Sequence, residues 1–249
     1  MGILEGTEAL LPARSVLPLE WPELEQALPD HGFPRGVVEI AAMPRLHGMR
    51  QVSPAGGSML HGGATSIAIA VMRAIHAADS QAWCAWISAP LDPPHGSPND
   101  RTPPVHAPAL AQANVDLDRL LIVRPSRQAL ARTVVKVAAS GAFDLVIIDA
   151  PHRNDLSGLR DVSSRTGRGG APPQGKDGSS ALVVRKLALA AEECGTSSLL
   201  LTSALTPRSV PWPVALRLEV ERRPDALAVR VTKDRRGAGS SQHVVRLAG

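Results

Sequence analysis

The sequence predicts an α/β fold with a mostly parallel central sheet flanked by helices, completed by antiparallel C-terminal strands. Apolar runs of strand length alternate with segments of helical periodicity as far as Ser203, which is typical of a parallel sheet. From Val214 the pattern changes to alternating apolar and polar residues separated by turns, which predicts antiparallel strands. With 249 residues and 44% hydrophobic content, the chain can bury a full core.

Each expected element has a local signal. A short helix is expected within 17–28, entered at Pro22, and a turn follows at 30–36. Strands are expected at 36–42, 81–89, 120–123, 143–149 and 197–203, then at 214–220, 226–232 and 243–247. Helices are expected at 67–78, 105–114, 126–140 and 180–194. Ser126 is the expected N-cap of the third helix, and Gly141 and Gly195 are expected to end the last two.

The domain organisation follows from where this pattern is interrupted. We expect an N-terminal extension with a short helix at 1–35 and a single core at 36–249. An inserted loop at 43–61, rich in Met, Arg and Gly, suits a surface flap. The segment 151–178 has six Gly, three Pro, five basic and three acidic residues and almost nothing to pack, so it is predicted to be disordered.

Composition excludes several classes of protein. No run of 18 apolar residues exists, and the N-terminus has an acidic residue where a signal peptide would be basic, so a soluble cytoplasmic protein is expected. Cys84 and Cys194 lie far apart without a partner motif, which indicates neither a disulfide framework nor a metal site.

The formal charge of +4 is concentrated at the C-terminal end. Residues 1–213 hold 19 basic and 19 acidic side chains, whereas residues 214–249 hold eight basic and four acidic ones. A local positive surface suits nucleic acid or an acidic partner, but it is also common on solvated hairpins.

A glycine-rich turn after the first core strand has the order of a phosphate-binding loop. The residues concerned are Gly62, Gly63, Ala64, Thr65 and Ser66. In such a loop, backbone N–H groups and a Lys bind phosphate while a Ser or Thr hydroxyl holds magnesium. Ala64 stands at the Lys position, and a second alignment over 57–62 puts Gly63 there. The same glycines also fit a plain tight turn before a helix.

Five stretches, in the right order, resemble the RecA core. They are 32–40 at its entry, 84–92 at its second strand, 115–125 leading to its third, 140–149 at its magnesium-side strand and 229–235 at its late basic strand. The resemblance implies a RecA-like fold with Asp149 at the magnesium position. It also implies that Lys233 and Arg235 match residues that, in RecA filaments, reach the neighbouring subunit's nucleotide.

Departures from the RecA pattern predict that the chain is not an ATPase. The loop Lys is missing, Pro90 occupies the position of the Glu that activates water, and Ser203 stands near the position of the phosphate-sensing Gln. Losing the cation and the base lowers the rate on the order of a thousandfold or more. We therefore expect no catalytic residue and no cofactor, with Asp149 either a relic or part of a weak ATP and magnesium site.

Further stretches are more similar to the ImuA-type and SulA-like accessory proteins of the bacterial SOS response than to RecA itself. They are 83–90, 106–110, 117–125 and 129–130. This resemblance implies a non-catalytic role in DNA-damage-induced translesion mutagenesis. The implied partners are RecA, an ImuB-type polymerase-like protein and an error-prone DNA polymerase, with single-stranded DNA as a further candidate.

Two other functions remain open from the sequence. One is a divergent DNA-dependent ATPase in which Arg45 or Arg50 replaces the loop Lys. The other is a single-stranded-DNA-binding RecA paralogue, for which a steep salt dependence is expected. The residues expected to contact DNA or a partner are Arg153, Arg160, Arg165, Arg168, Lys176, Arg230, Lys233, Arg235 and Arg236.

Overall fold

The computed structural model describes residues 16–17, 19–43, 62–89, 105–150, 156, 177–205, 212–235 and 242–246. The helices are α1 (Pro22–Gln26), α2 (Gly62–Ala78), α3 (Ala107–Gln112), the short 3-10 helix η1 (Leu117–Arg119), α4 (Arg127–Ala138) and α5 (Asp177–Cys194). The strands are β1 (Val16–Leu17), β2 (Phe33–Pro34), β3 (Val37–Ala42), β4 (Cys84–Ser88), β5 (Leu120–Val123), β6 (Leu145–Asp149), β7 (Ser197–Ser203), β8 (Leu216–Arg222), β9 (Ala226–Asp234) and β10 (Gln242–Arg246).

Eight strands form one sheet in the order β10-β9-β8-β3-β7-β6-β4-β5. The six strands from β8 to β5 are parallel, and β9 and β10 join them as antiparallel strands. Strand β3 lies in the middle, with Val38 between Leu199 of β7 and Leu216 of β8. The predicted α/β class, with a mostly parallel sheet and antiparallel C-terminal strands, is confirmed.

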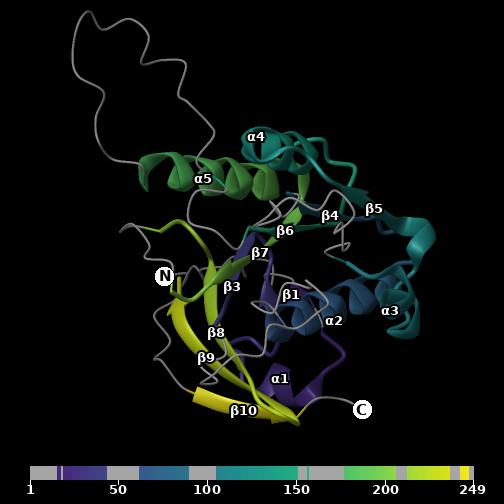
Figure 1. The fold of residues 1–249 in the computed structure, drawn as a ribbon, viewed down its shortest axis with the longest axis vertical. Helices are drawn as coiled ribbons and strands as arrows, with labels where there is room; N and C mark the ends of the chain where they lie inside the picture. Colours follow the sequence, from purple (N-terminus) through teal and green to yellow (C-terminus); the bar gives the residue numbers. More distant parts are fainter. Residues whose placement is uncertain are drawn as a thin grey trace, which may run out of the picture.

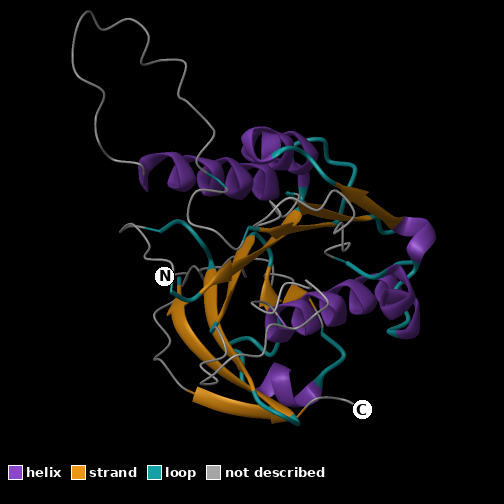
Figure 2. Cartoon of the chain, viewed as in Figure 1, coloured by secondary structure: helices purple, strands orange, loops and turns teal. Residues whose placement is uncertain are grey.

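Helices cover both faces of the sheet, as Figures 1 and 2 show. Helices α4 and α5 lie on one face, and α1, α2 and α3 lie on the other. Alternate residues of each strand therefore enter different cores. The core under α2 includes Ile40, Trp86 and Ile147, whereas the core under α4 and α5 includes Ile87 and Ile148.

The N-terminal helix begins at Pro22, as predicted, and ends at Gln26. Two other predicted helix starts were wrong. Helix α2 begins at Gly62, five residues before its predicted start, so the predicted glycine-rich turn lies within the helix. Helix α5 begins at Asp177, inside the segment predicted to be disordered. Ser126 is the N-cap of α4 as expected, but its side chain makes no capping hydrogen bond. Gly141 and Gly195 follow α4 and α5 with φ of 67° and 75°, a conformation that favours glycine.

Most of the two predicted loops lies outside the described residues. This applies to 44–61 of the inserted loop and to most of 151–178. Besides the start of α5, one residue of the second loop is described: Leu156, which is buried in the core under α4 and α5. The prediction that this segment has almost nothing to pack was therefore wrong at that position.

Candidate functional site

The N-terminus of α2 packs tightly against the strands beside β3. A Cβ atom added to Gly63 would lie 2.8 Å from Val220 Cγ1 and 3.1 Å from Leu227 Cδ2. Val220 is paired with Ala42, the last residue of β3. Helix α2 therefore begins at the carboxyl end of the central strand, and only glycine fits this approach without a shift of the neighbouring side chains.

The two positions that could have carried the phosphate-binding Lys are both closed by packing. Ala64 is fully buried and belongs to the core under α2. Gly63 faces Val220 and Leu227, as described above. Thr65 and Ser66 are partly exposed on the first turn of α2. The turn therefore presents hydroxyl groups and backbone N–H groups, without an ammonium group at either aligned position.

Asp149 ends β6 on the same face of the sheet as α2. It is paired with Ser88 of β4 and Leu201 of β7. Since Leu145 and Ile147 enter the core under α2, strand alternation directs Asp149 to that face as well. The Ser88 hydroxyl is buried and has no hydrogen-bond partner among the described residues.

The sequence-predicted nucleotide residues thus lie at one edge and on one face of the sheet. Strand β7 separates β6, which carries Asp149, from β3, which leads toward α2. Two strand spacings amount to about 10 Å. Ser203 of β7, the residue at the phosphate-sensing position, ends the intervening strand. Carboxyl ends of parallel strands are where open α/β sheets bind ligands.

The chemistry available at this edge is limited. Across the described parts of the chain, no group of three or more His, Cys, Asp or Glu could hold a metal ion. Pro90, which the resemblance to RecA aligned with the water-activating Glu, lies outside the described residues. The polar groups that the structure describes at this end of the strands are hydroxyls, backbone N–H groups and the Asp149 carboxylate, a set that can bind a ligand.

Lys233 and Arg235 lie beside the amino ends of the parallel strands, opposite the ends that carry the α2 turn and Asp149. The intervening Asp234 pairs with Leu216, which in turn pairs with Val38 near the start of β3. Both basic residues line a cavity of about 580 Å³ whose walls also include Trp212. Within one molecule, the structure therefore does not bring Lys233 and Arg235 together with the α2 turn and Asp149.

Lys233 is held by its surroundings rather than projecting freely. Its ammonium group donates a hydrogen bond to the Trp212 carbonyl oxygen. Burial lowers the pKa of Lys233 below its usual value, Glu39 opposes this by raising it, and Arg235 lowers it further.

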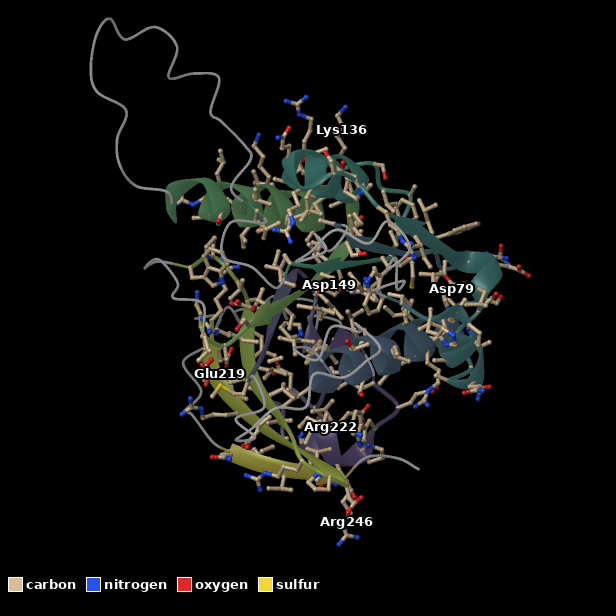
Figure 3. All side chains as sticks on the ribbon, viewed as in Figure 1. Asp79, Lys136, Asp149, Glu219, Arg222 and Arg246 are labelled. Carbon is tan, nitrogen blue, oxygen red and sulfur yellow. The ribbon has the colours of Figure 1, made fainter. Side chains whose placement is uncertain are left out.

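Arg230, predicted as a contact residue for DNA or a partner, is paired with a carboxylate within the sheet. It contacts the carboxylate of Glu219 on the neighbouring strand β8. Glu219 is labelled in Figure 3. Arg223 is similarly close to Glu221 at 3.6 Å. The positive charge of the C-terminal strands is therefore partly neutralised locally. The other predicted contact residues lie outside the described residues: Arg153, Arg160, Arg165, Arg168, Lys176 and Arg236.

The sequence analysis missed a buried carboxylate in the central strand. Glu39 of β3 is fully buried and accepts hydrogen bonds from Thr202 Oγ1 at 2.7 Å and from Trp212 Nε1 at 2.8 Å. Arg217 Nε lies 3.7 Å from Glu39 Oε2. A single Glu inside an otherwise apolar strand run, VVEIAA, was the available signal, because an ionised side chain there needs partners.

Comparison with known proteins assigns this chain to no family. No family model matches it, and no curated protein matches it. Among the described helices, none has the length and apolar character needed to cross a membrane.

Proposed function

We propose that this chain is a non-catalytic, RecA-like accessory protein of the DNA-damage response. It acts in damage-induced translesion mutagenesis through contacts with RecA and with a complex of an ImuB-type protein and an error-prone polymerase. No nucleotide hydrolysis is part of this role. The proposal rests on the sequence resemblances, which cover most of the chain from about Val16.

The packing at the start of α2 is the structural observation that supports the non-catalytic part of the proposal. Ala64 is buried in the core and Gly63 is in close contact with Val220, so both aligned Lys positions are committed to packing. Asp149 meanwhile keeps its place at the carboxyl edge of a parallel sheet. A site with a carboxylate and a helix N-terminus but without the aligned cation supports weak nucleotide binding or none, and a role through protein contacts.

The first test measures ATP hydrolysis stimulated by single-stranded DNA. The assay uses this protein alone, RecA alone and the two together. We expect no activity from this protein and a changed RecA rate in the mixture. Hydrolysis by this protein that disappears in Asp149→Asn would refute the non-catalytic role and favour the divergent ATPase. An unchanged RecA rate, together with no co-purification of either partner, would refute the adaptor role.

A variant at the cationic edge tests how the chain meets RecA. If Arg235 matches a residue that reaches toward a neighbouring subunit's nucleotide, Arg235→Ala should weaken the effect on RecA several-fold. Arg132→Ala on α4 is the matched control, since it removes the same charge from a different surface. Equal effects of the two variants would contradict this mode of contact.

The single-stranded-DNA-binding alternative is less well supported by the described residues. Arg217, Arg223 and Arg230 each lie within ion-pair distance of a Glu on the same sheet, which reduces their attraction for phosphate. A steep fall of DNA affinity with salt would favour this alternative over the adaptor.

A further inference from the structure

Strand β5 forms one end of the sheet and presents an open edge. Among the strands that the structure describes, it pairs with β4 alone, in parallel register from Leu120 to Val123. Figure 1 shows β5 at the side of the molecule opposite β8 and β9. No other described strand pairs with the backbone groups on its outer side, so a strand of another chain would complete their hydrogen bonds.

The side chains of β5 are unusually apolar for an edge strand. All four residues of Leu120–Val123 are aliphatic and none is fully buried, and Leu121 is 42% exposed. Leu117 and Trp83 nearby are also exposed, at 40% and 42%. Exposed edge strands are usually protected by charges, proline or a covering element, because an apolar open edge invites association.

Two exposed residues near the ends of β5 carry opposite charges. Asp118 lies in η1, two residues before the strand, and Arg124 directly follows it; neither forms an ion pair among the described residues. Arg119, which directly precedes β5, instead donates to Gln81 and lies over the Trp83 ring. An antiparallel copy of the same strand, centred on Leu121, would bring each Asp118, in η1, close to an Arg124. The symmetry of such a pair produces this contact twice.

We propose that the β5 edge binds a second copy of this chain, whose own β5 adds antiparallel across a twofold axis at Leu121. The two sheets then become continuous, with Leu120 opposite Ile122 and Leu121 opposite its own symmetry mate. Charge disfavours one neighbouring register: an axis between Leu121 and Ile122 would place Arg119 opposite Arg124, which is repulsive. This inference is independent of the proposed function.

The other end of the sheet is a suitable control surface. Strand β10 also ends the sheet, and Val244 is 60% exposed there. Its residues alternate in burial, and α1 is bonded to its end: Trp21 Nε1 donates to the Arg246 carbonyl, and the Arg246 N–H donates to Glu23 Oε2. Strand β10 therefore lacks the continuous apolar run that β5 presents.

Sedimentation of the full-length chain over a range of concentrations tests the proposal. We expect a reversible dimer of twice the 26.2 kDa monomer mass. Leu121→Lys should give a monomer, because two ammonium groups would meet at the axis. Val244→Lys, which adds the same charge at β10, should leave the dimer unchanged. A wild-type chain that is monomeric at every concentration would overturn the proposal.

Charge exchange tests the register and does not depend on the apolar variant folding. Asp118→Arg or Arg124→Asp alone should weaken dimerisation about tenfold, since each creates two like-charge contacts. The double variant Asp118→Arg with Arg124→Asp should restore dimerisation. Single variants that dimerise as well as the wild type, or a double variant no better than the singles, would overturn the proposed register.

Discussion

Restoring a lysine at the aligned position of the glycine-rich turn should damage the fold without creating an ATPase. The substitution is Ala64→Lys. Ala64 is fully buried in the core under α2, so the new side chain must either displace apolar neighbours or extend along the helix toward its N-terminus. The first outcome combines overpacking with the burial of an ammonium group.

The magnitude follows from these two costs. Overpacking a core costs about 1–3 kcal/mol, and an unpaired buried ammonium adds to it, so we expect a loss of about 3 kcal/mol or more. For a chain of this size, that corresponds to a fall in Tm of about 6 to 12 °C. Thr65→Lys is the matched control: it adds the same charge one residue later at a partly exposed site, where proximity to the helix N-terminus costs under about 1 kcal/mol.

The assay combines thermal unfolding followed by circular dichroism with ATP hydrolysis in the presence of single-stranded DNA. An Ala64→Lys protein as stable as Thr65→Lys would show that the lysine can leave the core. Hydrolysis gained by Ala64→Lys and lost again on adding Asp149→Asn would refute our interpretation, because the site would then lack only its cation.

Three further outcomes are expected. Gly63→Ala should lower the free energy of unfolding in urea by about 1 kcal/mol, because its Cβ would lie 2.8 Å from Val220 Cγ1. The double variant Gly63→Ala with Val220→Ala should lose less stability than the sum of the two single variants. Additive losses would contradict the close contact. Glu39→Gln should lower the free energy of unfolding by about 2–4 kcal/mol and change the tryptophan fluorescence, because Trp212 donates to the buried carboxylate. Exposed Glu221→Gln should change the free energy of unfolding by no more than about 0.5 kcal/mol. Equal effects of the two variants would contradict the structural role of the Glu39 carboxylate. Burial lowers the pKa of His76 below its usual value of 6.5, so the unfolded state binds a proton more readily and the free energy of unfolding should fall as the pH drops below that value. His76→Gln should weaken this pH dependence. Parallel pH profiles of the wild type and the variant would refute the assignment to His76.

The fold class was predictable because hydrophobic periodicity reports burial directly. Strands β3, β6 and β7 are covered on both faces, so each contains adjacent apolar residues that stood out in the sequence: VV and IAA in β3, LVII in β6 and LLL in β7. The two-residue strands β1 and β2 were not predictable, since two residues carry no period. Their pairing depends on tertiary contacts instead.

The candidate site was predictable in its parts and not in its arrangement. The sequence indicated that the turn at Gly62 and Asp149 belong to the carboxyl edge, because both follow strands of a parallel sheet. It could not indicate that Ala64 enters the core, since a single alanine suits a core and a surface equally. The partners of Glu39 come from segments more than 160 residues away, so their convergence depends on the strand order.

Glu39 favours one register of β3 relative to its neighbouring strands. All six residues of β3 are buried, so hydrophobicity alone would tolerate a shift of one residue along its neighbours. Such a shift would turn the carboxylate toward the core under α2 and separate it from Thr202 and Trp212. The large cost of that misplaced charge leaves one pairing strongly preferred. We therefore expect Glu39 to fix the register of the central strand during folding. The protein is then less stable than it would be with a well-packed apolar residue at this position.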